Sequence, residues 1–205
     1  MRRSKRAFDL LASVTGLILL SPFLAIIAIA VKIGDRGPIL FRQERVGLEG
    51  RVFRILKFRT MVMDAERAGL QLTIGRDARV TQVGRILRRA KLDELPQLLN
   101  VACGEMSLVG PRPEVPKYVA RYTSEQRRVL SLLPGVTDPA SMKYADEADV
   151  LAHAADPERM YVEEVMPRKL QLNLSYAESA TFGSDVAVIL RTFGVITKPR
   201  RATRL

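Results

Sequence analysis

The chain has 205 residues, 47% of them hydrophobic and 27% charged, which is enough for one domain-sized core and an appendage. A single cysteine and a single histidine (Cys103 and His153) argue against a disulfide framework, a Cys/His zinc site and a Cys–His nucleophile pair. The formal net charge of +11 calls for a polyanionic partner, while 6% aromatic residues without tryptophan make a base-stacking surface for nucleic acid a poor fit.

Residues 10–31 carry no charge, and as a helix they rise about 33 Å, which is long enough to cross a bilayer. A cleaved signal peptide is the alternative, but no small-x-small cleavage site precedes a polar mature start. Pro22 removes a backbone donor, and Ser21 can offer its hydroxyl to the carbonyl that is freed. We therefore expect a break or kink at Ser21–Pro22.

The charges on both sides of this segment constrain its topology. Four basic residues precede it and four follow it, so the positive-inside rule draws both ends toward the cytoplasm. Two arms of about ten residues, broken at Ser21–Pro22, satisfy both ends as a re-entrant hairpin, and a kinked spanning helix is the alternative. We expect residues 1–33 to form this membrane helix hairpin and residues 34–205 to form a cytoplasmic domain.

Residues 39–45 and 51–60 have the pattern of two extended segments joined by a glycine-bounded turn, which predicts a β-hairpin. Alternate residues of the second segment share one face, so a core-anchored strand would deliver Lys57 and Arg59 toward one end. These two cations either bind phosphate or form an exposed basic strand end. The polar connection at 74–80 is expected to be a mobile loop.

Apolar residues recur with helical spacing at positions 80, 83, 86 and 87, and arginines fill the other faces of this segment. The helix brings Arg88 and its neighbours Arg85 and Arg89 close to the carboxylates that follow. Arginine binds phosphate well because its guanidinium can donate two parallel hydrogen bonds. An amphipathic helix lying on anionic lipid headgroups is the alternative.

Two adjacent carboxylates, Asp93 and Glu94, lie between this basic run and an apolar run at 95–101 that has helical spacing. Asp is a favoured N-cap and Pro96 is tolerated in a first turn, so we expect both carboxylates at a helix start, where free backbone N–H groups also attract anions. A nucleophile or a metal ligand can be built there. The alternative is a helix cap beside a solvated Glu.

Arg112 lies between Pro111 and Pro113, which restrict the backbone on both sides and aim its side chain at low entropic cost. A rigid turn with one cation suits a pyrophosphate or a nucleotide. Taken alone, such a turn is also a common plain connector.

Five short motifs follow one another along the chain: Lys57-Phe58-Arg59-Thr60-Met61, Leu92-Asp93-Glu94-Leu95-Pro96-Gln97-Leu98, Asn100-Val101, Met106-Ser107-Leu108-Val109-Gly110-Pro111-Arg112-Pro113 and Pro134-Gly135-Val136-Thr137. In these motifs and their order the chain resembles the bacterial sugar transferase family, the monotopic phosphoglycosyl transferases that start glycoconjugate assembly on polyprenol phosphate. The resemblance extends from residue 5 to about Asp185, nearly the whole length of the chain.

The resemblance implies transfer of a sugar 1-phosphate from a UDP-sugar to undecaprenyl phosphate, with release of UMP and a requirement for Mg²⁺. It implies that Asp93 is the nucleophile, forms a covalent phosphosugar-aspartate and lies at the metal, and that Glu94 is its partner. Arg88 and Arg112 match family cations near the nucleotide or phosphates, and Lys57 and Arg59 match the basic strand end.

The resemblance also implies a place in the bacterial inner (cytoplasmic) membrane, with the catalytic domain at 34–205 on the cytoplasmic face. The expected partners are UDP-sugar, undecaprenyl phosphate and inner-membrane lipids, with no nucleic acid, and a homo-oligomer is left open. The expected fold class is α/β: the hairpin followed by a small mixed domain rich in amphipathic helices.

The chain departs from the commonest family pattern after residue 137, where it reads Asp138-Pro139-Ala140-Ser141-Met142-Lys143-Tyr144. The sugar is therefore not carried over from the family. Two other functions fit the composition: a membrane-tethered, Mg²⁺-dependent pyrophosphate hydrolase, and a non-catalytic binder of anionic lipid or nucleic acid. The hydrolase would release phosphosugar without a lipid acceptor, and the binder would tolerate loss of the Asp93 carboxylate.

Overall fold

A computed structural model describes residues 3–63, 65, 72, 74–75 and 77–197, apart from the side chains of 193 and 195–197. Most of the expected mobile connection lies within this range, but residue 76 lies outside it. Helices dominate, as expected for a mixed α/β domain. In chain order the elements are α1 (Arg3–Asp35), β1 (Leu40–Val46), η1 (Leu48–Gly50), β2 (Val52–Phe58), α2 (Gln82–Arg89), η2 (Leu92–Glu94), α3 (Gln97–Cys103), β3 (Ser107–Val109), α4 (Pro116–Val119), η3 (Gln126–Ser131), β4 (Gly135–Thr137), α5 (Pro139–Lys143), α6 (Glu147–Ala152), α7 (Pro157–Met160), η4 (Tyr161–Val165), α8 (Met166–Ser179) and α9 (Phe182–Thr197).

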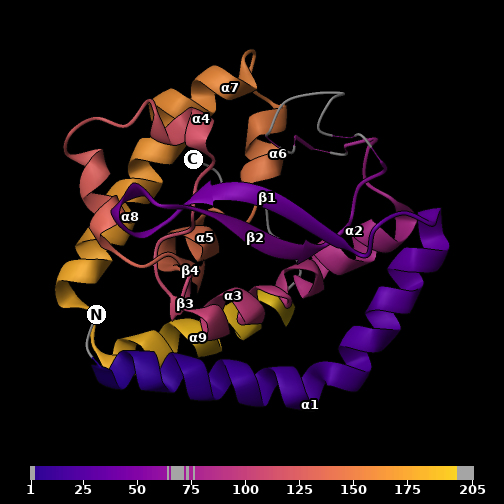
Figure 1. Cartoon of the computed structure of the whole chain (residues 1–205). Coiled ribbons are helices and arrows are strands. Elements are labelled where there is room, and N and C mark those ends of the chain that lie inside the picture. The colour runs from indigo at the N-terminus through magenta and orange to yellow at the C-terminus, as the bar shows by residue number, and fades with distance from the viewer. Residues whose placement is uncertain (1–2, 64, 66–71, 73, 76, 198–205) are drawn as a thin grey trace.

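The predicted β-hairpin is confirmed. Strands β1 and β2 pair antiparallel from Leu40 opposite Phe58 to Val46 opposite Val52, and the hairpin crosses the middle of the molecule (Figure 1). A second sheet was not predicted: β3 and β4 pair in parallel, with Ser107 opposite Gly135. Strands of three residues are too short to show an alternating pattern, so only the tertiary fold defines them.

Helix α1 is one element of 33 residues that bends along its length (Figure 1). Pro22 lies inside it, and proline is a common cause of such bends because it removes a backbone hydrogen bond. The hydroxyl of Ser21 donates to the carbonyl of Ile18 at 2.8 Å. The expected kink is therefore present, within a continuous bent helix rather than two antiparallel arms.

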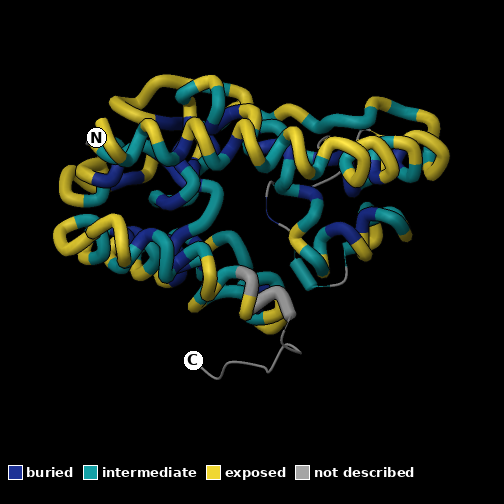
Figure 2. The backbone as a smooth tube through the Cα atoms, turned by 90° about the horizontal axis from the view of Figure 1, so that it is seen from below, coloured by how far each residue is buried: buried dark blue, intermediate teal, exposed yellow. Residues whose placement is uncertain are grey.

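The outer surface of α1 is apolar and open. Leu11, Ile18 and Leu19 are 69%, 67% and 74% exposed, and Figure 2 shows exposed residues along most of the helix. Within the described part of the chain, α1 is the only helix long and apolar enough to cross a membrane, by length and composition. This exposed surface predicts contact with lipid or another apolar phase.

Polar side chains tie the first turns of α1 to the rest of the molecule. Lys5 donates to Val109 O at 3.1 Å and forms an ion pair with Asp185 at 2.5 Å. Arg6 donates to the carbonyl of Val101 at 2.6 Å, near the end of α3. Asp9 is 1% exposed and accepts hydrogen bonds from the hydroxyl of Ser107 and the N–H of Leu108. The start of α1 is therefore part of the folded domain.

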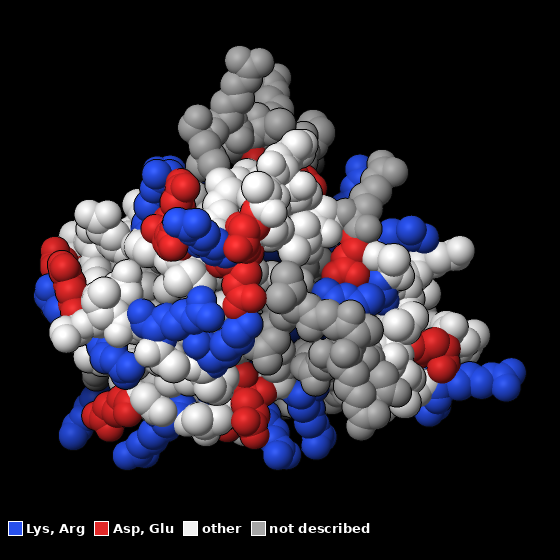
Figure 3. All heavy atoms as spheres, turned by 90° about the horizontal axis from the view of Figure 1, so that it is seen from above, with Lys and Arg blue, Asp and Glu red and all other residues white. Residues whose placement is uncertain are grey.

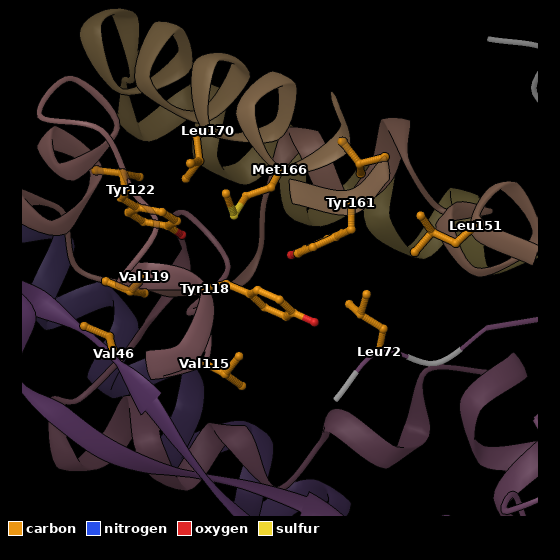
Figure 4. Close-up of a cluster of buried hydrophobic side chains, with 12 residues drawn as sticks. Val46, Leu72, Val115, Tyr118, Val119, Tyr122, Leu151, Tyr161, Met166 and Leu170 are labelled. Atoms are coloured by element: carbon orange, nitrogen blue, oxygen red, sulfur yellow. The ribbon is translucent and has the colours of Figure 1, made fainter. Parts of the chain in front are cut away.

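The largest hydrophobic cluster lies where α4 and β1 meet η4 and α8 (Figure 4). The rings of Tyr118 and Tyr161 pack with centroids 5.1 Å apart, and Met166 and Leu170 close the cluster from α8. Two smaller clusters lie near the carboxylate pair. One packs Ile27 and Val31 of α1 with Phe58 and Leu87, and the other packs Ile55 with Val101 and Met106. These two clusters fix β2 against α1, α2 and α3.

Candidate active site

Asp93 and Glu94 lie in the single 3-10 turn η2, between α2 and α3. The turn begins after Lys91, whose left-handed backbone (φ 57°) separates the turn from α2. The expectation that Asp93 caps a helix is wrong: Pro96 holds the N-cap position of α3, and no side chain caps that helix. Leu95 and Pro96 both have right-handed helical backbones, so the turn leads directly into α3.

Glu94 is held by two cations from distant parts of the chain. Lys57 donates from its Nζ to Oε1 at 3.0 Å, and Arg112 donates from Nη1 to Oε2 at 3.1 Å and from Nη2 to Oε1. Burial by itself raises the pKa of Glu94, but the charges of Arg112 and Lys57 outweigh it and hold the pKa well below its usual range. Glu94 therefore stays ionised.

Asp93 has the opposite environment. It is 8% exposed, and its carboxylate accepts no hydrogen bond from the residues that the structure describes. Burial raises the pKa of Asp93 and the neighbouring charge of Glu94 raises it further, against the opposing charges of Lys57 and Arg88. Two adjacent carboxylates thus differ sharply: one is bound and stabilised as an anion, and the other is desolvated and more basic.

The two cations that hold Glu94 are themselves shifted. Burial lowers the pKa of Lys57 to about 8, although Glu94 opposes this effect. The charge of Glu94 raises the pKa of Arg112. The arrangement concentrates positive charge beside the carboxylates, as an anionic substrate requires.

Arg88 is brought to the same place by helix α2. Burial lowers the pKa of Arg88, and the charge of Asp93 opposes that effect more than any other group does. Its Nε donates to the hydroxyl of Thr60, just after β2, at 2.8 Å. Thr60 is part of the motif at 57–61, but only the two cations of that motif were given a role from the sequence.

Arg59 binds to helix α1 instead of to the two carboxylates. It is 8% exposed and forms an ion pair with Asp35, the last residue of α1, and its Nη1 lies 3.8 Å from the sulfur of Met63. The prediction that alternation would deliver Lys57 and Arg59 together is met only for Lys57, since Arg59 lies beyond the end of β2 at Phe58. The structure therefore brings Lys57, Arg88 and Arg112 to the carboxylates and pairs Arg59 with α1.

Asn100 fixes the distance between the carboxylates and Lys57. From α3 its side-chain oxygen accepts from Leu56 N at 3.0 Å, and its amide donates to Arg54 O at 2.9 Å and to Glu105 at 2.7 Å. The side chain of Asn100 thus provides hydrogen-bond partners for backbone groups of β2 that do not pair with β1. A polar residue inside an apolar helical run was the available signal, because such a residue needs buried partners.

The turn that carries Arg112 is supported from behind. Arg45 donates to Pro113 O at 3.0 Å, and Glu114 accepts from the Tyr161 hydroxyl and from Val115 N at 2.8 Å. A shallow, open depression lies beside this turn, lined by Arg112 but not by Lys57, Asp93 or Glu94. The turn is therefore a rigid support for Arg112 at the rim of a hollow.

The side chains around Asp93 and Glu94 supply some of the ligands that a metal ion needs, but not a complete set. No cluster of three or more Asp, Glu, His or Cys side chains that would enclose a metal occurs among the described residues. Glu94 already accepts from two cations, so Asp93 is the carboxylate open to a metal. Mg²⁺ commonly binds through one or two carboxylates together with substrate phosphates, and this site fits that mode rather than an all-protein cage.

One face of the molecule shows how positive and negative side chains are distributed (Figure 3). On the face that Figure 3 shows, Lys and Arg side chains lie beside Asp and Glu at many points. Long stretches of exposed positive charge are the electrostatic footprint of nucleic-acid binding. Mixed charge on this face gives no support for such a surface there.

The sequence of the chain is similar to those of known proteins. The family model described as "Bacterial sugar transferase" matches residues 1–199. The chain is 35% identical over 197 residues to the UDP-N-acetylgalactosamine-undecaprenyl-phosphate N-acetylgalactosaminephosphotransferase of Aeromonas hydrophila, a match that covers 94% of this chain and 43% of that protein.

Two further relatives carry a different sugar in their names. The chain is 36% identical over 200 residues to the UDP-glucose:undecaprenyl-phosphate glucose-1-phosphate transferase of Escherichia coli (strain K12), covering 93% of this chain and 39% of that protein. It is 37% identical over 199 residues to the protein of the same name from Caulobacter vibrioides, covering 92% and 67%. The chain thus spans less than half the length of the first two relatives.

Proposed function

Because the chain belongs to the bacterial sugar transferase family, we propose that it transfers a sugar 1-phosphate from a UDP-sugar to undecaprenyl phosphate and releases UMP. The names of the relatives support both substrates, and they differ in the sugar. One relative is named an exopolysaccharide production protein, which supports a role at the start of glycoconjugate synthesis. The sugar itself stays open.

One observation carries this proposal: Asp93 is desolvated and accepts no hydrogen bond from the described residues, while Glu94 beside it is held by Lys57 and Arg112. A carboxylate is a poor nucleophile toward an anionic phosphate unless nearby cations screen the repulsion. Loss of solvation and hydrogen bonding makes Asp93 the more nucleophilic oxygen donor of the pair. The cations that Glu94 gathers supply the screening.

In the first step, an oxygen of Asp93 attacks the phosphorus that carries the sugar. The new bond joins that oxygen to phosphorus, and the bond to the bridging pyrophosphate oxygen breaks, so its electron pair leaves on UMP. In the second step, an oxygen of undecaprenyl phosphate attacks the same phosphorus and the bond to Asp93 breaks. A phosphate acceptor is largely ionised near neutral pH, so neither step needs a histidine base.

Glu94 has a part in both steps. It keeps Lys57 and Arg112 together beside the position of the phosphates, and its lowered pKa keeps it anionic throughout. Arg88 interacts with the charge of Asp93, and from there its own charge can stabilise the transferred phosphoryl group. In this way Glu94 assists the attack of the acceptor.

Mg²⁺ fits the open carboxylate of Asp93 together with the pyrophosphate, and when bound it would neutralise negative charge on the phosphates. Among the residues of the chain, Lys57, Arg88 and Arg112 bind the phosphates, and the turn at Pro111–Pro113 holds Arg112 against Glu94.

We further propose that α1 enters the bacterial inner membrane and returns to the same, cytoplasmic face. Lys5 near its start bonds to β3, and Asp35 at its end pairs with Arg59 just after β2, so both ends contact one folded domain. A bilayer cannot lie between two ends that are held by the same domain. The bend and the exposed apolar surface of α1 support a re-entrant helix.

The experiment is a UMP-release assay in nanodiscs with a panel of UDP-sugars, with and without undecaprenyl phosphate and Mg²⁺. We expect UMP release with one or a few donors, and a protein adduct with the mass of a sugar phosphate when the acceptor is omitted. Asp93→Asn removes the nucleophile at nearly constant shape, and we expect at least about a thousandfold loss of turnover. The exposed variant Asp149→Asn is the matched control.

The outcomes separate the alternatives. Phosphosugar released into water without acceptor would identify a pyrophosphate hydrolase instead. Wild-type turnover in Asp93→Asn, or UMP release only when donor and acceptor are both present and with no adduct at any time, would overturn the covalent route.

A further inference from the structure

Thr60, which follows β2 and to which the motif at 57–61 assigns no role, bonds to both ends of helix α2. Its carbonyl accepts from Thr81 N at 3.0 Å, and its hydroxyl accepts from the Nε of Arg88 at 2.8 Å. Thr81 is the N-cap of α2 and Arg88 lies in its last turn. Both ends of this two-turn helix are therefore attached to the same residue.

The backbones also approach closely at this point. A Cβ atom added at Gly84 would lie 2.1 Å from the carbonyl oxygen of Thr60, well inside van der Waals contact. Only glycine allows the helix to pass so near, so the close packing of α2 against the backbone of Thr60 depends on Gly84. The hydroxyl of Thr60 is consequently fixed relative to the side chain of Arg88.

The bond to Nε controls the direction of the whole guanidinium. The group is planar, so holding Nε in place fixes the plane and the direction of the Nη edge. Thr60 is 6% exposed, and a water molecule cannot readily replace its hydroxyl. Arg88 interacts with the charge of Asp93 from this position.

We propose that Thr60 is a positioning residue that acts through Arg88, holding its guanidinium toward Asp93 and the phosphoryl group in transfer. The proposal rests on the proposed function for the identity of that phosphoryl group. A misdirected guanidinium still carries its charge, so the loss falls on the orientation that the transition state needs.

The test compares Thr60→Val with Thr60→Ser. Valine keeps the shape of the side chain without the hydroxyl, and serine keeps the hydroxyl. We expect kcat/KM for the UDP-sugar to fall about tenfold in Thr60→Val, mainly in kcat, and to stay within about twofold of wild type in Thr60→Ser. In an Arg88→Lys background, which lacks Nε, we expect Thr60→Val to cost less than about twofold more.

A second readout does not depend on turnover. In ¹⁵N NMR spectra of the protein in nanodiscs, the Nε–H of Arg88 should exchange slowly with water in wild type and Thr60→Ser, and faster in Thr60→Val. A tenfold loss that persists in Arg88→Lys, a Thr60→Ser variant as poor as Thr60→Val, or equal exchange in wild type and Thr60→Val would overturn the proposal. If no UDP-sugar yields UMP, the proposed function fails, and the exchange rates alone still decide whether Thr60 positions Arg88.

Discussion

The guanidinium of Arg112 donates one hydrogen bond to each oxygen of Glu94. This pair joins the turn η2 to the turn at Pro111–Pro113, and Lys57 adds β2 to the same carboxylate. Three segments that are separate in the chain are therefore held at one acidic side chain. The carboxylate pair is at once the reactive centre of the proposed enzyme and a junction of its fold.

Neutralising Glu94 should destabilise the protein. Glu94→Gln leaves Lys57 and Arg112 without their anion in a buried site, and we expect the free energy of unfolding to fall by about 3 kcal/mol. Urea titration in nanodiscs measures the change. Glu163→Gln breaks an ion pair with Arg159 whose side chains are 71% and 57% exposed, and we expect no measurable change in the free energy of unfolding. Equal shifts in the two variants would refute a buried junction.

Lys57 should set an alkaline limit on activity. Its pKa is lowered to about 8, so raising the pH through this value removes a cation that the phosphates need, and kcat/KM should fall. In Lys57→Arg the cation persists, so the decline should move to a pH well above 8. A pH profile of kcat/KM for both proteins makes the measurement. An unchanged decline in Lys57→Arg would assign it to another group.

The free energy of unfolding should rise over the same pH range in which the activity falls. The unfolded chain keeps Lys57 protonated up to its ordinary pKa of 10.5, while the folded protein releases that proton from about pH 8. Between these values the unfolded state binds more protons, so this residue makes the free energy of unfolding rise with pH. Thermal unfolding at pH 7.5 and 9.5, with Lys57→Arg as control, separates this effect from the loss of activity.

Two buried asparagines should respond differently to the same substitution. Asn100→Leu removes three hydrogen bonds and leaves Leu56 N and Arg54 O without them, so we expect a loss of about 3 kcal/mol in the free energy of unfolding. The Oδ1 of Asn173 is buried and has no hydrogen-bond partner among the residues that the structure describes, so Asn173→Leu should change stability by less than about 1 kcal/mol. Similar losses in both would show that volume rather than hydrogen bonding decides.

The effects of substituting Asp35 and Arg59 on the free energy of unfolding should be coupled, because the two residues form one ion pair. Its side chains are 21% and 8% exposed, and it holds the end of α1 against the chain after β2. We expect Asp35→Asn and Arg59→Met each to lower the free energy of unfolding by about 2 kcal/mol, with a coupling energy of about 1 kcal/mol in the double variant. Denaturant titration of the four proteins gives the cycle.

The same variants test whether Arg59 also binds phosphate. As a bond between α1 and the domain, the pair should give matching effects, within about twofold, on the KM for undecaprenyl phosphate in both single variants. A rise in that KM for Arg59→Met alone would make Arg59 a ligand of the acceptor.

Much of the local structure follows from the sequence. Alternation and bounding glycines predict the hairpin β1–β2, and helical spacing predicts α2. These features depend on neighbours in the chain, which is why a pattern reveals them. The expected basic strand end is met only by Lys57, because β2 stops at Phe58 and Arg59 turns toward Asp35.

The amino-acid sequence by itself determined which residues carry the chemistry: two adjacent carboxylates, arginines that can bind phosphate, and a long uncharged segment near the start of the chain. Only the tertiary structure decided which role each of these residues has. Whether a carboxylate is bound, as Glu94 is by Lys57 and Arg112, or left desolvated, as Asp93 is, depends on side chains that arrive from distant segments. Burial and charge act through space over a few ångströms, and order along the chain does not record that distance.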